Sequence, residues 1–249
     1  MKNHNNYWLI GLLVVVFTVG FAGVTAAAAP VGVFAPGRES AGYQPMNQIG
    51  LPGMPTVGKW LISPDGQIAH WLGYKVKGKA LQEPINIILI DGVSQSVEEA
   101  NARLLQSCVD AGYDNMLGHS SGYFGFIDKK LFGQFPATEN RAFSNTFFWT
   151  ANNHGRIFGP HHFAGKYYYV AAFSREDLDM QTDVKHVYRS FVVARDDFAK
   201  QLSANSTYQI SGKVDLQNGV PNDLVHQMVG DHDGKAVVLE VVVDGIGVK

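Results

Sequence analysis

The pattern of hydrophobic and polar positions predicts short strands along most of the chain and two main helices. Residues 85–91 form a short run rich in β-branched side chains, which is typical of a buried strand. Directly after this run, Ser96 and Glu99 match a capping box, and a helix is predicted up to Gly112. Apolar residues at helical spacing predict the buried face of that helix: Ala100, Leu104, Leu105, Cys108 and Val109.

Further strands are predicted on both sides of this unit. Residues 57–62 and 67–76 are expected to form a hairpin around the turn 63–66, and 122–127, 143–150, 166–173, 207–216 and 235–243 also have strand character. A second helix is predicted from residue 188 or 190 to 202, with Arg195 on its inner face, and a short helix within 221–229. The predicted class is α+β: a mixed or mostly antiparallel sheet with two main helices packed on it, in a single globular domain.

The first 29 residues differ from everything that follows. Lys2 precedes an uncharged apolar run, residues 9–29, which ends in alanines that include Ala26 and Ala28. These three features predict a signal peptide over 1–28, so that the exported protein is secreted or periplasmic. The alternative is an uncut membrane anchor over residues 8–29, and only then is a membrane expected as a partner. A Gly/Pro-rich lead-in over 29–56 and the α+β domain over 57–249 would follow.

Composition excludes several classes of function. The formal net charge is −2 and no basic run is present, so nucleic acid is not an expected partner. Cys108 is the single cysteine, which excludes an internal disulfide, and its place in an apolar helix face indicates a core residue. No phosphate-binding loop or dinucleotide fingerprint occurs, and no cofactor is predicted.

The densest group of polar residues lies in 152–162, where two glycines and a proline predict irregular chain. A loop of this kind often carries a binding site. Imidazoles, amides and a guanidinium together suit a polar or anionic ligand. The residues predicted to bind it are Asn153, His154, Arg156, His161 and His162. In the alternative interpretation, these side chains only tie down their own backbone.

Two further interpretations concern metal binding and nucleophilic catalysis. His161 and His162 would need His119, His186 or His232 brought in by the fold to form a zinc site, and no spaced metal motif supports one, so none is predicted. Residues 118–123 pair a histidine with serines, but their spacing favours a plain turn. Residues 231–234 are likewise assigned to a structural turn.

Several segments together resemble the LssY C-terminal-like domain family. Residues 83–91 with the helix ending at Ala111-Gly112-Tyr113, then His154-Gly155-Arg156, 168–174 and Ala194-Arg195-Asp196, are similar to successive segments of that family. The resemblance covers roughly 83–202. Asp91 departs from it, and His161-His162 has no counterpart in it. The resemblance implies a fold and an envelope location, and it implies no activity, because the family has no settled one.

The function expected from the sequence is therefore that of an exported envelope or extracellular domain. It is expected to bind a polar or anionic ligand or a protein partner. An extracytoplasmic hydrolase with a site around His154 and Arg156 is the alternative, and a purely structural envelope protein is a third reading. Whether the protein is an enzyme stays open at this point.

Overall fold

The computed structural model describes residues 38–39, 47–76, 79–179, 185–220, 222–223 and 228–243. All of them belong to one compact unit, Val31–Lys249. The predicted signal peptide lies outside the described residues, as does most of the lead-in. Within the described ranges, no helix has the length and apolar character needed to cross a membrane.

Most of the regular secondary structure in this unit is strand, and two helices interrupt the succession of strands. The elements in chain order are β1 (Arg38–Glu39), β2 (Gln48–Ile49), β3 (Val57–Gly58), β4 (His70–Val76), β5 (Lys79–Gln82), β6 (Ile87–Asp91), α1 (Val97–Asp110), β7 (Asp114–Leu117), β8 (Phe124–Ile127), β9 (Lys130–Phe135), β10 (Arg141–Ser144), β11 (Asn152–Phe163), β12 (Lys166–Asp179), β13 (Lys185–Ser190), α2 (Phe191–Asn205), β14 (Tyr208–Asp215), β15 (Asn222–Asp223), β16 (Met228–Val229) and β17 (Lys235–Val241).

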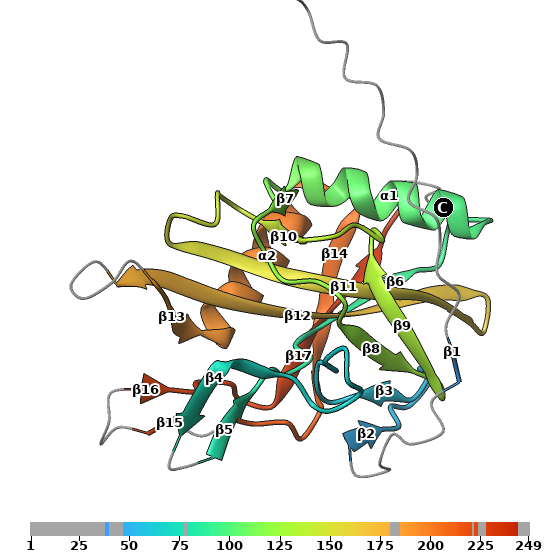
Figure 1. Ribbon diagram of the computed structural model, residues 1–249. Coiled ribbons are helices and arrows are strands. Elements are labelled where there is room, and N and C mark those ends of the chain that lie inside the picture. Colours follow the sequence, from blue (N-terminus) through green and yellow to red (C-terminus); the bar gives the residue numbers. More distant parts are fainter. Residues whose placement is uncertain are drawn as a thin grey trace, which may run out of the picture. The chain divides into compact units, whose positions relative to one another are not determined.

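Thirteen of the described strands form one curled sheet, which follows the order β14-β17-β6-β12-β11-β9-β8-β3-β2. The short strands β1, β7, β10 and β13 join this path at its side. All described pairings of the sheet are antiparallel except β17 with β6. The long hairpin of β11 and β12 crosses the middle of the fold (Figure 1). The predicted α+β class is confirmed in its coarse form, with the sheet dominant.

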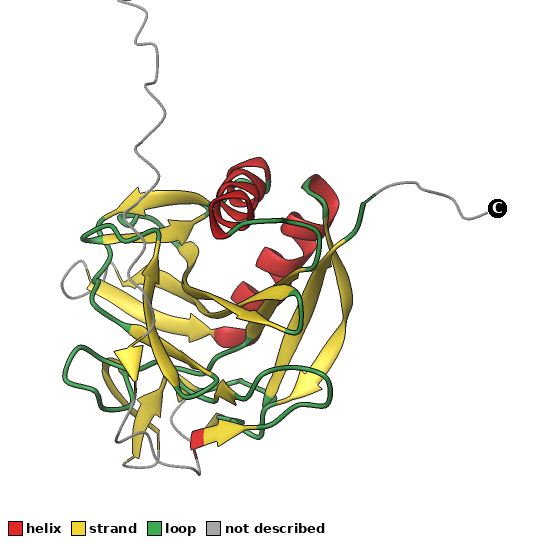
Figure 2. Ribbon diagram, turned by 90° about the vertical axis from the view of Figure 1, so that its right-hand side faces the viewer, coloured by secondary structure: helices red, strands yellow, loops and turns green. Residues whose placement is uncertain are grey.

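Each face of the sheet has its own hydrophobic core. Tyr169 and Phe173 of β12 point to the side covered by α1 and α2, whereas Val170 and Ala172 point to the opposite side. This alternation follows from the two-residue period of a strand. Figure 2 shows both helices on the same side of the long strands. The face away from the helices is covered by the short strands around β3, β8 and β9, because the sheet curls back over itself.

The predicted strand and helix at the centre of the sequence are confirmed as β6 and α1. Ser96 caps α1, since its hydroxyl oxygen accepts a hydrogen bond from the Glu99 backbone N–H. Leu104 and Cys108 are fully buried in the core between helix and sheet, as expected. Val109 was placed on the wrong face: 45% of it is exposed, because it lies at the edge of the apolar stripe.

Several local predictions are wrong. Residues 57–62 contain only the short β3, and β4 pairs with β5, so the expected hairpin is reduced to a bridge between Ile62 and Ile68. The strand expected over 143–150 ends at Ser144 and gives way to a loop. Residues 152–162 form the buried strand β11, because sheet pairing on both sides outweighs the local effect of their glycines and proline. In the described part of 221–229, β15 and β16 pair where a helix was expected.

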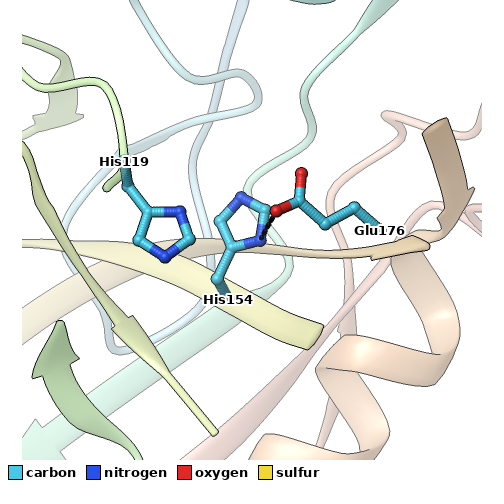
Figure 3. Close-up of side chains that lie close together, drawn as sticks. All are labelled: His119, His154 and Glu176. Carbon is cyan, nitrogen blue, oxygen red and sulfur yellow. Dashed lines mark ion pairs between the residues drawn. The ribbon is translucent and has the colours of Figure 1, made fainter. Parts of the chain in front are cut away.

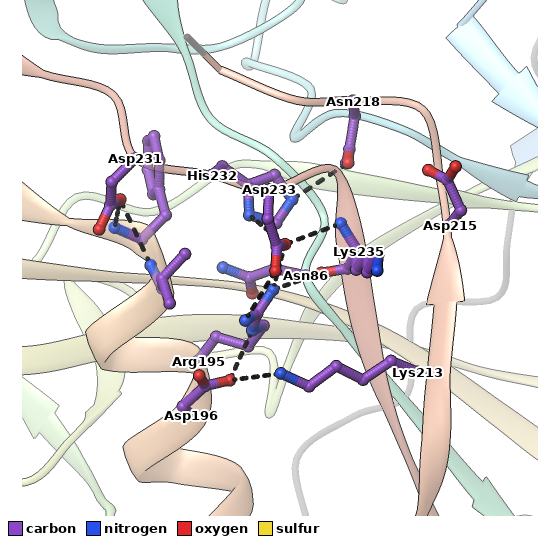
Figure 4. A network of polar contacts seen from close by, with 12 residues as sticks. Asn86, Arg195, Asp196, Lys213, Asp215, Asn218, Asp231, His232, Asp233 and Lys235 are labelled. Atoms are coloured by element: carbon purple, nitrogen blue, oxygen red, sulfur yellow. Dashed lines mark hydrogen bonds and ion pairs between the residues drawn. The ribbon is translucent and has the colours of Figure 1, made fainter. Parts of the chain in front are cut away.

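The second helix is confirmed as α2, and a polar network explains the arginine on its inner face. Arg195 is almost completely buried, and its guanidinium donates to Asp233 Oδ1 at 2.6 Å and to the Lys235 carbonyl oxygen at 2.8 Å (Figure 4). Asp231, two residues before Asp233, accepts a hydrogen bond of 2.8 Å from the Phe191 backbone N–H at the first turn of α2. The turn 231–234 therefore has the structural role that the sequence predicts.

Candidate functional site

The hairpin of β11 and β12 places four polar side chains on the sheet face away from the helices. Asn152, His154 and Arg156 alternate along β11, so all three point to one side. Glu176 stands opposite Asn152 in the ladder with β12 and points to the same side. Gly155 lies between His154 and Arg156, and a Cβ atom there would lie 2.4 Å from the Phe173 ring, so the helix side of this strand position has no room for a side chain.

His119, His154 and Glu176 form a buried cluster (Figure 3). One potential ligand atom of each lies within 4.8 Å of those of the other two. His119 comes from the connection between β7 and β8, and its ring stacks on that of His154 with a centroid distance of 4.6 Å. The buried Nε2 atom of His119 has no hydrogen-bond partner. A buried nitrogen without a partner costs free energy, and a bound ligand would supply the missing interaction.

Asn152 connects two members of this cluster and defines the tautomer of one. Its amide nitrogen donates to Glu176 Oε1 and to the Thr150 carbonyl oxygen, both at 2.9 Å. The amide oxygen of Asn152 therefore faces His154 Nδ1 at 2.9 Å, and it must accept the proton there. The lone pair of the neutral His154 ring is thus on Nε2. Metal-binding histidines have this arrangement, with one ring nitrogen donating to the protein and the other free.

Burial also keeps the imidazoles uncharged. The pKa of His119 is lowered to about 4, mainly by burial and in addition by the charges of Arg156 and His186. Burial is also the main reason why the pKa of His154 lies well below 6.5, and His119 and Arg156 add to it. Both rings are consequently neutral at pH 7, and neutral imidazole is the form that binds metal ions.

The pKa values of the carboxyl groups around the cluster are shifted upwards, because burial disfavours their charged form. Burial raises the pKa of Glu176, although the hydrogen bond from Asn152 and the proximity of His186 act against this shift. Burial also raises the pKa of Glu83, which is opposed by Arg156. With both carboxyl groups ionised, the buried group would carry one negative charge more than Arg156 balances. A bound cation would compensate that charge.

His186 completes the group at its more exposed edge. It lies on β13, and its Nδ1 atom is 2.8 Å from Glu176 Oε1, although the angle is not that of a hydrogen bond. The ring of Phe148 stacks on the His186 ring at 6.2 Å. Phe148 also fills the space beside Gly118, where a Cβ atom would lie 2.2 Å from its ring. The aromatic side chain thus packs against two segments that carry site residues.

Arg156 holds the segment that carries His119. Its Nε donates to the Ser120 carbonyl oxygen at 3.1 Å, and its Nη2 donates to Ser120 Oγ at 3.0 Å. The guanidinium lies over the Tyr123 ring at 4.6 Å, and Nη1 is 4.0 Å from Glu83 Oε2. These contacts engage the buried guanidinium with protein groups on several sides. Arg156 is therefore a positioning residue for His119.

The structure brings together only part of the predicted ligand-binding set. His154 and Arg156 share one face of β11, whereas Asn153 points to the helix side and donates to Asp197 of α2 at 2.8 Å. His161 and His162 lie beyond a register shift at the other end of the strand. His161 Nε2 is 3.3 Å from Asp128 Oδ2. The exposed His162 packs on Tyr167. Among the described residues, no contact joins His161 or His162 to the cluster around His154.

Sequence reasoning missed Asn152, His119, Glu176 and His186 as members of one site. His119 and His186 were named as zinc partners of His161 and His162 and as histidines that could share a cleft with His154; the structure brings His119 and His186 to His154, without His161 and His162. Once β11 is known to be a strand, the two-residue alternation of Asn152 and His154 signals a shared face. Glu176 could be found only from the register of β11 against β12.

Comparison with known proteins adds no relative to this picture. A scan against family models, a search of curated proteins and a search of solved structures each found no match. The chemical possibilities of the site therefore rest on its geometry. Two neutral imidazoles and a carboxylate in a buried cluster are a donor set for a divalent transition-metal ion, zinc above all.

Proposed function

We propose that this protein is an exported metal-binding domain, in which His119, His154 and Glu176 hold one divalent ion. The observation that carries the proposal is the convergence of these three buried side chains, one ligand atom of each lying within 4.8 Å of the others. The Nε2 atom of His119, which is buried without a hydrogen-bond partner, adds to it. Zinc fits this donor set best, since its usual ligands include histidine nitrogen and carboxylate oxygen. Tetrahedral bonding at about 2.1 Å separates ligand atoms by about 3.4 Å, so the present cluster needs only a modest contraction.

A metal ion would replace the polar or anionic ligand expected from the sequence, for which no metal was predicted. An anionic ligand would meet Glu176 and Glu83 in the same buried region, and Arg156 is already engaged by Ser120. A cation meets neutral imidazoles and a carboxylate, and it offsets the cost of burying that carboxylate. The charge balance therefore favours a cation over an anion at this position.

The test is zinc titration of the untagged, chelator-treated protein, with calorimetry for affinity and elemental analysis for stoichiometry. We expect one zinc ion per chain. His119→Phe keeps the ring stacked on His154 but removes the metal ligand, and Glu176→Gln keeps the side-chain size but removes the charge. Each should weaken zinc binding by about 100-fold or more, since even the loss of an outer partner weakens metal sites 10- to 100-fold.

His162→Phe serves as the matched control, because it removes an exposed histidine outside the cluster. This variant should bind zinc like the wild type. Equal loss of affinity in His162→Phe and His119→Phe would show that zinc binds elsewhere, and the proposal would fail. It would fail equally if the wild-type protein did not bind zinc at micromolar concentrations.

The second candidate function is a metal-dependent hydrolase outside the cytoplasm. Three protein ligands are typical of catalytic zinc, because the fourth position is left for water or substrate. In this reading His186, at the exposed edge of the cluster, is placed to exchange a proton with the bound water. If His186 binds the ion as a fourth ligand instead, the site is closed and structural. The absorption spectrum of the cobalt-substituted protein, with and without His186→Phe, separates these two arrangements.

Export and the similarity to the LssY C-terminal-like family belong to the same proposal. Residues 1–28 support a cleaved signal peptide, and amino-terminal sequencing of the exported protein should find Ala29 at or near its start. A full-length product retained in the membrane would favour the anchor instead. Residues 83–202, which resemble the family, contain β6 and α1 as well as β11, β12 and α2.

A further inference from the structure

α1 and the end of α2 enclose a groove on the helix side of the sheet. Both helices lie on the same side of the long strands (Figure 2), and they contact each other. The groove is lined by residues on one face of α1, within 99–110, and by residues 204–207 at the end of α2. Its volume of about 680 Å³ lies within the range of about 300–1,000 Å³ that is usual for small-molecule sites. Its lining residues are not those of the candidate metal site, so the groove is a separate place for a ligand.

Ser107 brings to this groove a hydroxyl group that the protein leaves without a partner. The residue is only 4% exposed, and it lines the groove from α1. No hydrogen bond to its Oγ atom occurs within the described part of the chain. The Ser206 hydroxyl, which also lines the groove, is instead used by the protein, because it donates to the Leu202 carbonyl oxygen at 2.7 Å. Since buried hydroxyl groups are nearly always hydrogen-bonded, Ser107 points to a polar ligand in the groove.

The ionic side chains of the groove leave negative charge unbalanced. Asp91 and Glu99 both pair with Arg103, at 3.2 and 3.0 Å, so these three side chains together carry one negative charge. Asp110 adds a second negative charge at the other end of the groove. Its Oδ1 atom accepts a hydrogen bond of 2.8 Å from the neutral Gln106 amide, and among the described residues no cation pairs with it. The charge balance therefore favours a ligand with two positive charges.

The ends of both helices strengthen this preference. α1 ends at Asp110 and α2 at Asn205, and both residues line the groove. Neither helix has a basic residue in its last turn, so no side chain there compensates the partial negative charge of the carbonyl end. The negative charges extend along the groove, because about 16 Å of helix axis, at about 1.5 Å per residue, separates Glu99 from Asp110. An elongated cation fits this distribution better than a compact one.

We propose that this groove binds a linear polyamine. One ammonium group would lie beside Asp110 and the carbonyl end of α2, and another would lie towards Glu99. Ala102 and Ala204 would contact the alkyl chain between them, and the Ser107 Oγ atom would accept a hydrogen bond from an N–H group of the ligand. Two unbalanced negative charges along one groove match a chain that carries ammonium groups at intervals. This inference goes beyond metal binding and does not depend on it.

The test is calorimetric titration of the chelator-treated and dialysed protein with spermidine at low ionic strength. Butylamine, which has one ammonium group, should bind about tenfold more weakly than spermidine, because it balances only one of the two negative charges. Asp110→Asn removes the charge but keeps the acceptor for Gln106, and Ser107→Ala removes the unpartnered hydroxyl. Each should weaken spermidine binding about tenfold, since a charge-assisted hydrogen bond is lost. Glu139→Gln is the matched control, because it removes an exposed carboxylate outside the groove, and it should bind spermidine like the wild type.

Amide NMR spectra of the wild type locate the bound polyamine without any variant. Spermidine should shift the amide signals of Ser107 and Thr207 most, and those around His119 should stay in place. The proposal is overturned if spermidine does not bind at millimolar concentrations, if butylamine binds as tightly, or if Glu139→Gln weakens binding as much as Asp110→Asn. A lysine-rich peptide that binds more tightly than spermidine would also overturn it, since the groove would then be a docking site for a protein segment.

Discussion

Replacement of Arg156 by alanine separates a positioning arginine from one that contacts a ligand. The guanidinium is buried and donates two hydrogen bonds to Ser120, beside His119. Its loss would leave the Ser120 carbonyl oxygen without this donor and would uncover one face of the Tyr123 ring. We expect the variant to lose both folding stability and zinc affinity, because His119 would no longer be held over His154.

The size of the effect follows from these contacts. A hydrogen bond from a charged donor contributes about 1.5–3 kcal/mol, and the cation–π contact with Tyr123 adds about 0.5–2 kcal/mol. Part of this is regained, since Glu83 has a raised pKa and can take up a proton when Arg156 is absent. We therefore expect the free energy of unfolding to fall by about 3–4 kcal/mol. Arg189→Ala, which removes an exposed arginine paired with Asp177, should cost less than about 1 kcal/mol.

The assay is urea denaturation of both variants in chelator, followed by zinc titration of each under conditions where it is folded. Arg156→Lys keeps the charge but cannot form the two-pronged contact with Ser120, so its stability and its zinc affinity should lie between those of wild type and alanine. An Arg156→Ala protein as stable as wild type, with ligand binding abolished, would refute the positioning role. That result would restore the ligand-contacting arginine expected from the sequence.

Three further outcomes test the core and the site. Leu104→Ala should lower the free energy of unfolding by about 2–5 kcal/mol, whereas Val109→Ala should change it little, as chemical denaturation will show. Cys108 should react with a thiol reagent only as fast as the protein opens, because burial both shields the thiol and raises its pKa. The pKa of His119 is lowered from 6.5 to about 4, so the unfolded chain takes up the proton first and metal-free protein should lose stability as pH falls from 6.5 towards 4. His119→Phe should lose less over this range, and an identical pH profile of the two proteins would contradict the assignment.

Local sequence patterns were enough to predict β6 and the two helices. The unit of β6 and α1 was predicted because Leu104 and Cys108 repeat at helical spacing after a short apolar run, and because Ser96 provides a cap. The second helix was predicted in the same way, including Arg195 on its inner face. What the pattern could not supply was the partner of Arg195, since Asp233 is brought to it by the turn before β17.

The site residues of β11 are of types common in loops, although they stand in a buried strand. For this reason the sequence did not reveal the site as a whole. Asn, Gly, His and Arg in β11 read as loop residues, because an isolated strand gains nothing from burying them. In the fold, hydrogen bonds offset the free-energy cost of burying these polar side chains. Asn152 pairs with Glu176 and His154, and Arg156 pairs with Ser120. Gly155 leaves the room that Phe173 fills on the opposite face. Apart from the contact between Asn152 and His154, none of these interactions is local in sequence.

A buried ring nitrogen beside this strand pair has no hydrogen-bond partner, and it points to the site more clearly than composition does. His119 Nε2 remains buried and unpartnered although polar side chains surround it. Arg156 and the contacts of Phe148 hold the segment around His119 in that position. A fold that only needed to bury a histidine would gain by pairing this nitrogen with a neighbour. Rigid support for an unsatisfied donor or acceptor is what a preorganised binding site requires, because the ligand then supplies the missing interaction without rearrangement. We propose that a metal ion between His119, His154 and Glu176 would meet that requirement in this chain.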